Sequence, residues 1–202
     1  MRESQDSVNQ IQEERKKRGE IKDISQSGKA IVGSMFAQLL HYLLLKNKEV
    51  GNIPAHILVT RSKAQAERMF EEDFKVYIGG EKQTPDCDMI IYNKNTKKFI
   101  ILSLKTSLRE RAGQTFKWKL LWEIANSSNT KLKDKFDIKY KGKVTPNICF
   151  VTADFYHEID SSQHRGMFKF FDGSFIAKPN VEHDLVMSLS DLPAYIKKSL
   201  CR

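Results

Sequence analysis

The spacing of apolar residues first divides the chain into predicted helices. Between Ser25 and Lys46, apolar side chains recur every three or four residues, which predicts a helix with one face in the core and Ser25 or Ser27 at its N-cap. A second amphipathic helix is expected from Ser62 to Phe74, capped by Ser62. Further helices are expected at about Leu108 to Asn126 and at Ser190 to Leu200. The expected core positions of the first helix are Ile31, Met35, Leu39, Leu40 and Leu43.

Other segments have the pattern of strands. Continuous apolar runs at Met89–Tyr92 and Phe99–Leu102 flank the polar turn sequence NKNTKK, which predicts a hairpin of two buried strands. Further strands are expected near Ile57 to Val59 and Val144 to Val151. Phe168 to Ile176, with Asp172-Gly173 inside it, predicts another hairpin or a large loop. The chain has no internal repeat or Pro/Gly/Ser linker, so we expect residues 1–202 to form a single mixed α/β domain.

Charge adds a weak indication of the binding partner. The chain carries 34 Lys and Arg against 25 Asp and Glu, a formal net charge of +9. Such a balance favours polyanions, although an ordinary basic protein would also have it. A basic run, Arg15 to Arg18, lies in an expected helical N-terminal arm of about residues 1–24. This arm either contacts DNA or is a solvated helix.

The sequence argues against a membrane protein, a secreted protein and a protein with a disulfide framework or a zinc site. The longest apolar runs are far shorter than the roughly 18 residues of a membrane span, and residues 1–22 are charged throughout without a signal core. Cys87, Cys149 and Cys201 are widely spaced and form no metal-binding or disulfide pattern. We therefore expect an intracellular, reduced protein.

Most of the candidate catalytic residues lie between Thr84 and Gln114. Asp86 and Asp88 lie at the start of the first hairpin strand, while Ser103 and Lys105 lie at the end of the second. A turn centred on Asn95-Thr96 would place Asp88 opposite Ser103, and Asp86 opposite Lys105. Two carboxylates and an amine would then meet at one end of the sheet. Phosphodiester hydrolysis uses such a group, because carboxylates hold Mg²⁺ and a lysine neutralises charge that develops on the phosphate.

This segment resembles the PD-(D/E)xK signature of the restriction-endonuclease superfamily. The resemblance rests on Pro85-Asp86, on Ser103-Leu104-Lys105, and on the following SLRER run, which is similar to one found in a subset of type II enzymes. It implies a restriction-endonuclease-like fold, a central mixed β-sheet flanked by helices. It also implies Mg²⁺-dependent, sequence-specific cleavage of double-stranded DNA by a homodimer in the cytoplasm of a prokaryote, with a cognate methyltransferase that protects host DNA.

The sequence departs from the signature at one position. Ser103 stands where an Asp or Glu is usual, so the resemblance implies a second carboxylate from elsewhere. Glu67 is the first candidate, and Glu71, Glu72 and Glu110 are the others. The primary ligand is either Asp86, which the Pro-Asp pair favours, or Asp88, which the hairpin register favours.

The remaining candidate residues would contact DNA. Phosphate contacts are expected after the lysine, where Ser107 would cap a helix that aims its N-terminus at a phosphate. Base contacts are expected in the polar segment Asp160 to Lys169. The full set is Ser107, Arg109, Arg111, Gln114, Lys117, Lys119, Gln163, His164 and Arg165.

Two alternatives stay open. The same fold and signature serve structure-specific repair or junction-resolving nucleases. Since Ser103 is neutral, the chain is alternatively a DNA-binding protein that has lost catalysis.

Overall fold

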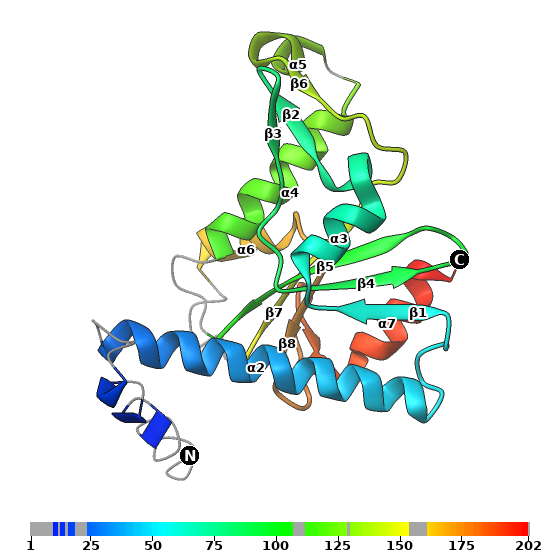
Figure 1. The fold of residues 1–202 in the computed structure, drawn as a ribbon. Helices are drawn as coiled ribbons and strands as arrows, with labels where there is room; N and C mark the ends of the chain where they lie inside the picture. The colour runs from blue at the N-terminus through cyan, green and yellow to red at the C-terminus, as the bar shows by residue number, and fades with distance from the viewer. Residues whose placement is uncertain are drawn as a thin grey trace.

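The fold is built on a mixed central sheet with helices on both of its faces (Figure 1). The structure, a computed structural model, describes residues 10–11, 13–14, 16–18, 24–106, 112–128, 130–153 and 161–201. Its central sheet has the strand order β1-β4-β5-β7-β8-β9, and a smaller sheet has the order β3-β2-β6. This architecture confirms the expected fold class.

The helices and strands have the following bounds. The helices are α2 (Ile24–Glu49), α3 (Lys63–Phe70), α4 (Ala112–Asn126), α5 (Thr130–Phe136), α6 (Ser162–Phe168) and α7 (Leu192–Leu200), with 3₁₀ turns η1 (Glu71–Phe74) and η3 (Leu189–Asp191). The strands of the central sheet are β1 (Ile57–Thr60), β4 (Met89–Asn93), β5 (Phe99–Lys105), β7 (Asn147–Thr152), β8 (Gly173–Ile176) and β9 (Met187–Ser188). Those of the smaller sheet are β2 (Val76–Ile78), β3 (Glu81–Gln83) and β6 (Ile138–Lys139).

The central sheet changes from antiparallel to parallel pairing at β5. Strands β1, β4 and β5 pair antiparallel, whereas β5, β7, β8 and β9 pair parallel. Helix α4 lies in the connection from β5 to β7, and α6 in the connection from β7 to β8, as parallel pairing requires a crossover. The C-terminal ends of β5, β7 and β8 therefore share one edge of the sheet.

Each face of the sheet packs against different helices. On one face, Leu40 and Leu44 of α2 and Ile196 of α7 belong to the same buried cluster as β-strand residues such as Ile100. On the other face, Phe70 of α3 and Trp122 of α4 belong to a second buried cluster. Strands β4 and β5 are buried along their whole lengths, because helices cover both of their faces.

The predicted hairpin and several of the helix positions are confirmed. Met89 pairs with Leu102 and Ile90 with Ile101, which is the predicted register. Ser62 caps α3, since its side chain accepts a hydrogen bond from the Gln65 amide. Helix α2 begins at Ile24, so Ser25 and Ser27 lie inside it rather than at its N-cap.

The hairpin expected between Phe168 and Ile176 is wrong. Residues up to Phe168 belong to α6, and β8 pairs with β7 in parallel. The Asp172-Gly173 pair therefore ends a crossover connection instead of reversing a hairpin. Strands β2, β3 and β6 were not expected either, because each has only two or three residues and β3 is largely exposed.

The predicted core face of α2 is only partly correct. Ile31 and Leu40 are buried, but Met35, Leu39 and Leu43 are exposed, and Ala37 and Leu44 are also buried. The helix has apolar residues on two sides, so spacing alone does not identify the side that faces the sheet. Within the described residues, no helix is both long and apolar enough to cross a membrane.

Candidate active site

Asp88 and Lys105 meet at the edge of the sheet where β5 ends. The β4–β5 register continues to Asp88, whose amide donates a hydrogen bond to the Leu102 carbonyl oxygen at 3.1 Å. Lys105 is the last residue of β5, and its Nζ lies 3.3 Å from Asp88 Oδ2. The hairpin thus brings together a carboxylate and an amine that are 17 residues apart in the sequence.

The hydrogen bonds that the described residues make to the Asp88 carboxylate fall on one of its two oxygens. Oδ2 accepts hydrogen bonds from the Leu104 amide at 2.7 Å and from Lys105 Nζ at 3.3 Å. Among the described residues, no hydrogen bond or ion pair involves Oδ1. The Asp88 side chain is 33% exposed and the Lys105 side chain 10% exposed. The carboxylate is held in place through Oδ2, and Oδ1 accepts no hydrogen bond from the residues that the structure describes.

Asp86 and Glu67 lie in the same neighbourhood as Asp88. Burial is the main reason that the pKa of the Cys87 thiol rises to about 12, and the charges of Asp88, Asp86 and Glu67 raise it further, against an opposing effect of Lys63. Asp86 is exposed, and Glu67 lies on α3 with its carboxylate 3.7 Å from Lys82 Nζ. Three carboxylates therefore act on one thiol, although only Asp88 contacts Lys105.

The Ser103 side chain packs against helix α4 and does not face solvent at the end of β5. It is 3% exposed, and its hydroxyl accepts a hydrogen bond at 2.7 Å from Thr115 of α4. This contact joins β5 to α4 immediately behind the Asp88–Lys105 pair. Thr115 was not expected to have a role, because nothing in its sequence context marks it.

Lys119 is buried and paired with carboxylates, in contrast to the exposed phosphate contact expected from its place in a basic helix. It is 6% exposed, and its Nζ lies 2.9 Å from both carboxylate oxygens of Asp172 and 2.7 Å from Glu123 Oε1. Burial would lower its pKa, but the hydrogen bonds to Asp172 and Glu123 outweigh this effect and raise the pKa above its usual value. The ion pair ties α4 to the start of β8.

The other expected DNA contacts divide into two groups. Gln114 and Lys117 are exposed on α4. Gln163 is exposed and His164 and Arg165 are half-buried on α6, which follows the end of β7 and so lies toward the same edge as Lys105. His164 Nδ1 lies 2.7 Å from the Ser161 hydroxyl, and Arg165 lies 3.4 Å from Asp184. Ser107, Arg109, Glu110 and Arg111 lie outside the described residues, as does Arg15 of the N-terminal arm.

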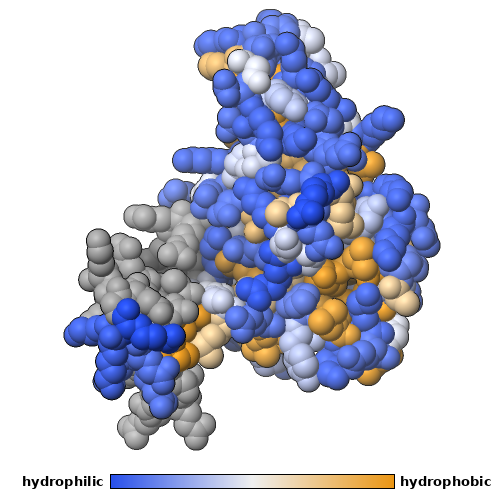
Figure 2. All heavy atoms as spheres, viewed as in Figure 1, coloured by the Kyte–Doolittle hydropathy of each residue, from blue (hydrophilic) through white to orange (hydrophobic). Residues whose placement is uncertain are grey.

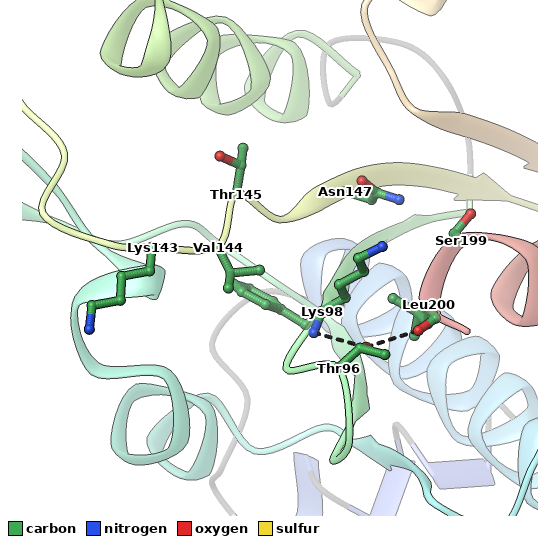
Figure 3. A pocket seen from close by; sticks show the side chains of 9 residues that line it. Thr96, Lys98, Lys143, Val144, Thr145, Asn147, Ser199 and Leu200 are labelled. Atoms are coloured by element: carbon green, nitrogen blue, oxygen red, sulfur yellow. Dashed lines mark hydrogen bonds between the residues drawn. The ribbon is translucent and has the colours of Figure 1, made fainter. Parts of the chain in front are cut away.

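A pocket of about 390 Å³ lies at the opposite end of the hairpin (Figure 3). It is lined by residues of the β4–β5 turn, including Thr96 and Lys98, together with Lys143 and Leu200. Thr96 donates a hydrogen bond to the Leu200 carbonyl oxygen at 2.9 Å. Because this pocket is at the turn and the Asp88–Lys105 pair is at the strand ends, the two are separate features.

The residues around Asp88 fit a hard divalent cation. Asp88 and Asp86 offer carboxylate oxygens, the donors that Mg²⁺ prefers, and Mg²⁺ commonly takes only one or two carboxylates beside water and phosphate oxygens. Within the described part of the chain, no group of three or more His, Cys, Asp or Glu residues is arranged to hold a metal ion. These residues therefore suit a metal site in which water or phosphate oxygens supply the remaining ligands, and not one formed by protein ligands alone.

Together, the fold and this edge define a class of protein. A mixed sheet flanked by helices, with β5 leading through α4 to the parallel β7, is a restriction-endonuclease-like fold. The family model of the BsaWI restriction endonuclease, type 2, matches residues 63–194, about two thirds of the chain. The chain belongs to this family and is a type II restriction endonuclease, a site-specific deoxyribonuclease that acts on double-stranded DNA. Among curated proteins, none matches the chain significantly.

Proposed function

We propose that the enzyme hydrolyses phosphodiester bonds of double-stranded DNA at a short sequence, with Mg²⁺ as cofactor and with Asp88 and Lys105 at the centre of the active site. The observation that carries this proposal is the 3.3 Å contact of Lys105 Nζ with a carboxylate whose second oxygen has no partner in the described residues. Restriction endonucleases generally use a divalent metal, typically Mg²⁺. Asp88 would hold the cation, which would polarise the scissile phosphate and lower the pKa of the attacking water.

The residues of the chain have distinct roles in this scheme. Asp88 is the primary ligand, because the Leu104 amide and Lys105 fix its carboxylate at the edge of the sheet. Asp86 and Glu67 would supply the additional carboxylates for the cation. Lys105 orients the attacking water and neutralises negative charge that develops on the phosphate in the transition state. Ser103 acts as a positioning residue, since its hydroxyl is bonded to Thr115.

DNA would lie across the edge formed by the C-terminal ends of β5 and β7. Lys117 and Gln114 of α4 are exposed beside this edge, and Gln163, His164 and Arg165 of α6 are the candidates for contacts with bases. Ser107, Arg109 and Arg111 complete the proposed set of DNA contacts. The domain that carries them spans residues 1–202, with a basic N-terminal arm of about 1–24 as a further contact.

Cleavage of both strands at a palindromic site requires two active sites related by a two-fold axis, so we propose a homodimer. We also propose a cytoplasmic enzyme of a prokaryote, with a methyltransferase of the same system that modifies the recognition sequence in host DNA.

The direct test is incubation of the purified enzyme with unmethylated phage DNA, in Mg²⁺ and in EDTA, beside a Lys105→Ala variant. Discrete fragments are expected only for the wild-type enzyme in Mg²⁺, and sequencing of their ends would give the site. Intact DNA from a folded wild-type protein over a range of divalent cations would contradict the proposal. Selective cutting of four-way junctions would instead support a structure-specific nuclease.

A further inference from the structure

One side of α2 exposes a continuous row of apolar side chains. Seven of the ten large hydrophobic residues that are exposed in the described part of the chain lie on α2 or directly after it. Six of them form what we call the α2 stripe, with exposed fractions from 41% to 71%: Val32, Met35, Leu39, Tyr42, Leu43 and Val50. In the space-filling view, apolar residues interrupt the hydrophilic surface over the lower half of the molecule, where α2 runs (Figure 2).

The two exposed flanks of α2 differ in character. At 3.6 residues per turn, the α2 stripe covers about 100° of the helix circumference on one side of the buried face. The other flank carries Ser34, Gln38, His41 and Lys48, with Leu45 as its one large exposed hydrophobic residue among the described positions. An ordinary solvated helix would be polar on both flanks. The asymmetry therefore indicates a surface that is covered in the working protein.

We propose that the α2 stripe is covered by the α2 stripe of a second copy of this chain, with the two helices packed antiparallel across a two-fold axis near Leu39. The inference rests on the proposed homodimer and assigns the surface through which it forms. The stripe lies outside residues 63–194, the region that the family model matches.

The spacing of the stripe is self-complementary. Positions 32, 35, 39, 42 and 46 alternate steps of three and four residues, as in helices that pack against each other along a seam. An antiparallel arrangement about Leu39 places Met35 opposite Leu43 of the second copy, and Val32 opposite the aliphatic stem of Lys46. The stripe runs about 27 Å along the helix axis. It would supply the apolar centre of an interface that, at standard size, buries about 800 Å² on each partner.

Charge favours the antiparallel orientation over the parallel one. Lys46 lies on the same side of α2 as the stripe, and it pairs with Glu49 at 2.6 Å and lies 5.7 Å from the Tyr42 ring centroid. A parallel pair would place Lys46 beside its own copy. The antiparallel pair separates the two Lys46 positions by about 21 Å along the axis, well beyond the screening length of about 8 Å at physiological ionic strength.

The first experiment measures the mass of the full-length protein in solution by sedimentation velocity for the wild type, Leu39→Glu and the matched control Gln38→Glu. Both substituted positions are exposed and adjacent on the same helix, so folding is expected to survive, and thermal melting checks it. We expect dimers for the wild type and Gln38→Glu, and a dimer dissociation constant raised at least about a hundredfold for Leu39→Glu. A dimer unaffected by Leu39→Glu would overturn the proposal.

A second experiment tests the orientation by disulfide formation in a Cys201→Ser background, which removes the exposed native thiol. Burial raises the pKa of Cys87 and Cys149 to about 12, so these thiols react slowly near neutral pH. Leu39→Cys and the double variant Val32→Cys/Lys46→Cys are expected to cross-link into dimers, whereas Val32→Cys alone is not. Cross-linking of Val32→Cys alone would contradict the antiparallel arrangement.

These outcomes separate this inference from the proposed activity. A monomeric wild type that cuts DNA would overturn the α2 interface and leave the nuclease intact. A monomeric wild type that Leu39→Glu destabilises would mean that another segment of the same chain covers the stripe, and would also overturn the proposal. A dimer that Leu39→Glu dissociates but that cuts no DNA would support the interface and contradict the activity.

Discussion

Two lysine–aspartate pairs of the same molecule, Lys105–Asp88 and Lys119–Asp172, differ in how many of their carboxylate oxygens accept hydrogen bonds from the described residues. Their exposures are similar, with side-chain exposed fractions of 10% and 33% in the first pair and 8% and 28% in the second. Exposure therefore does not separate them.

The difference lies in their partners. Both oxygens of Asp172 accept from Lys119, Oδ2 also accepts from the Ile148 amide, and Lys119 binds Glu123 as well. In the Asp88 pair, every contact that the described residues make falls on Oδ2. A pair whose hydrogen bonds are all made within the protein stabilises the fold, whereas a pair with an oxygen that the described residues leave unbonded is suited to bind a ligand. The comparison predicts that substitutions at the two pairs have opposite effects on activity and stability.

The largest expected effect is on cleavage by Lys105→Ala. Loss of the amine removes charge stabilisation in the transition state, and we expect the single-turnover rate to fall at least about a thousandfold, equivalent to about 4 kcal/mol. The free energy of unfolding should change by no more than about 1 kcal/mol, because Lys105 has one carboxylate partner among the described residues whereas Lys119 has two. A rapid-quench assay with chemical denaturation checks both values. A variant that cuts at the wild-type rate would remove Lys105 from the active site.

The next effect is on stability, in Lys119→Met. Removal of the amine leaves Asp172 and Glu123 without their cation, and breaking a buried pair costs about 3 kcal/mol. We expect the denaturation midpoint to fall while the folded fraction still cuts DNA. If the variant keeps its stability and loses cleavage, the roles assigned to the two pairs are reversed.

The pH dependence of that stability difference follows from the raised pKa of Lys119. A group whose pKa is higher in the folded state stabilises the protein fully below its unfolded pKa, about 10.4, and loses the effect as the pH rises through the folded value. The difference in unfolding free energy between wild type and Lys119→Met should therefore be constant from about pH 7 to pH 9 and should shrink only above about pH 10. A difference that disappears between pH 7 and pH 9 would contradict this assignment.

The smallest effect is expected for Ser103→Ala. This change leaves the buried Thr115 hydroxyl without its partner and should cost about 1–2 kcal/mol of unfolding free energy. Cleavage should stay close to the wild-type rate if Ser103, whose hydroxyl is bonded to Thr115 of α4, acts as the proposed positioning residue. A loss of about a hundredfold in rate would instead give Ser103 a direct part in catalysis.

The sequence was sufficient to predict the hairpin and its register, because two continuous apolar runs flank a polar turn. It also predicted that carboxylates and Lys105 gather at the open end of the hairpin. The individual contact was not predicted: the register placed Asp86 opposite Lys105, whereas Lys105 contacts Asp88. That contact depends on the direction of the side chains beyond the last paired residues, which the register does not specify.

Features that depend on distant residues were not predictable. Lys119 looks like any lysine of a basic helix, and only Asp172, 53 residues away, shows it to be buried. The parallel pairing of β7 and β8 depends on the crossover through α6, which the aromatic residues near Phe168 concealed. Helix α2 has apolar residues on two sides, and only its packing on the sheet shows that Leu44 is inside and Leu39 outside.

The measurement that tests the central claim most directly is the single-turnover cleavage rate of Asp88→Asn beside Asp86→Asn, at equal DNA occupancy and over a titration of Mg²⁺. If Asp88 is the primary ligand, Asp88→Asn should lose at least about a thousandfold in rate at every Mg²⁺ concentration. Asp86→Asn should retain more activity and recover part of its loss at high Mg²⁺. The opposite order, with Asp88→Asn nearly fully active and Asp86→Asn inactive, would contradict the assignment of the active site to the Asp88–Lys105 pair.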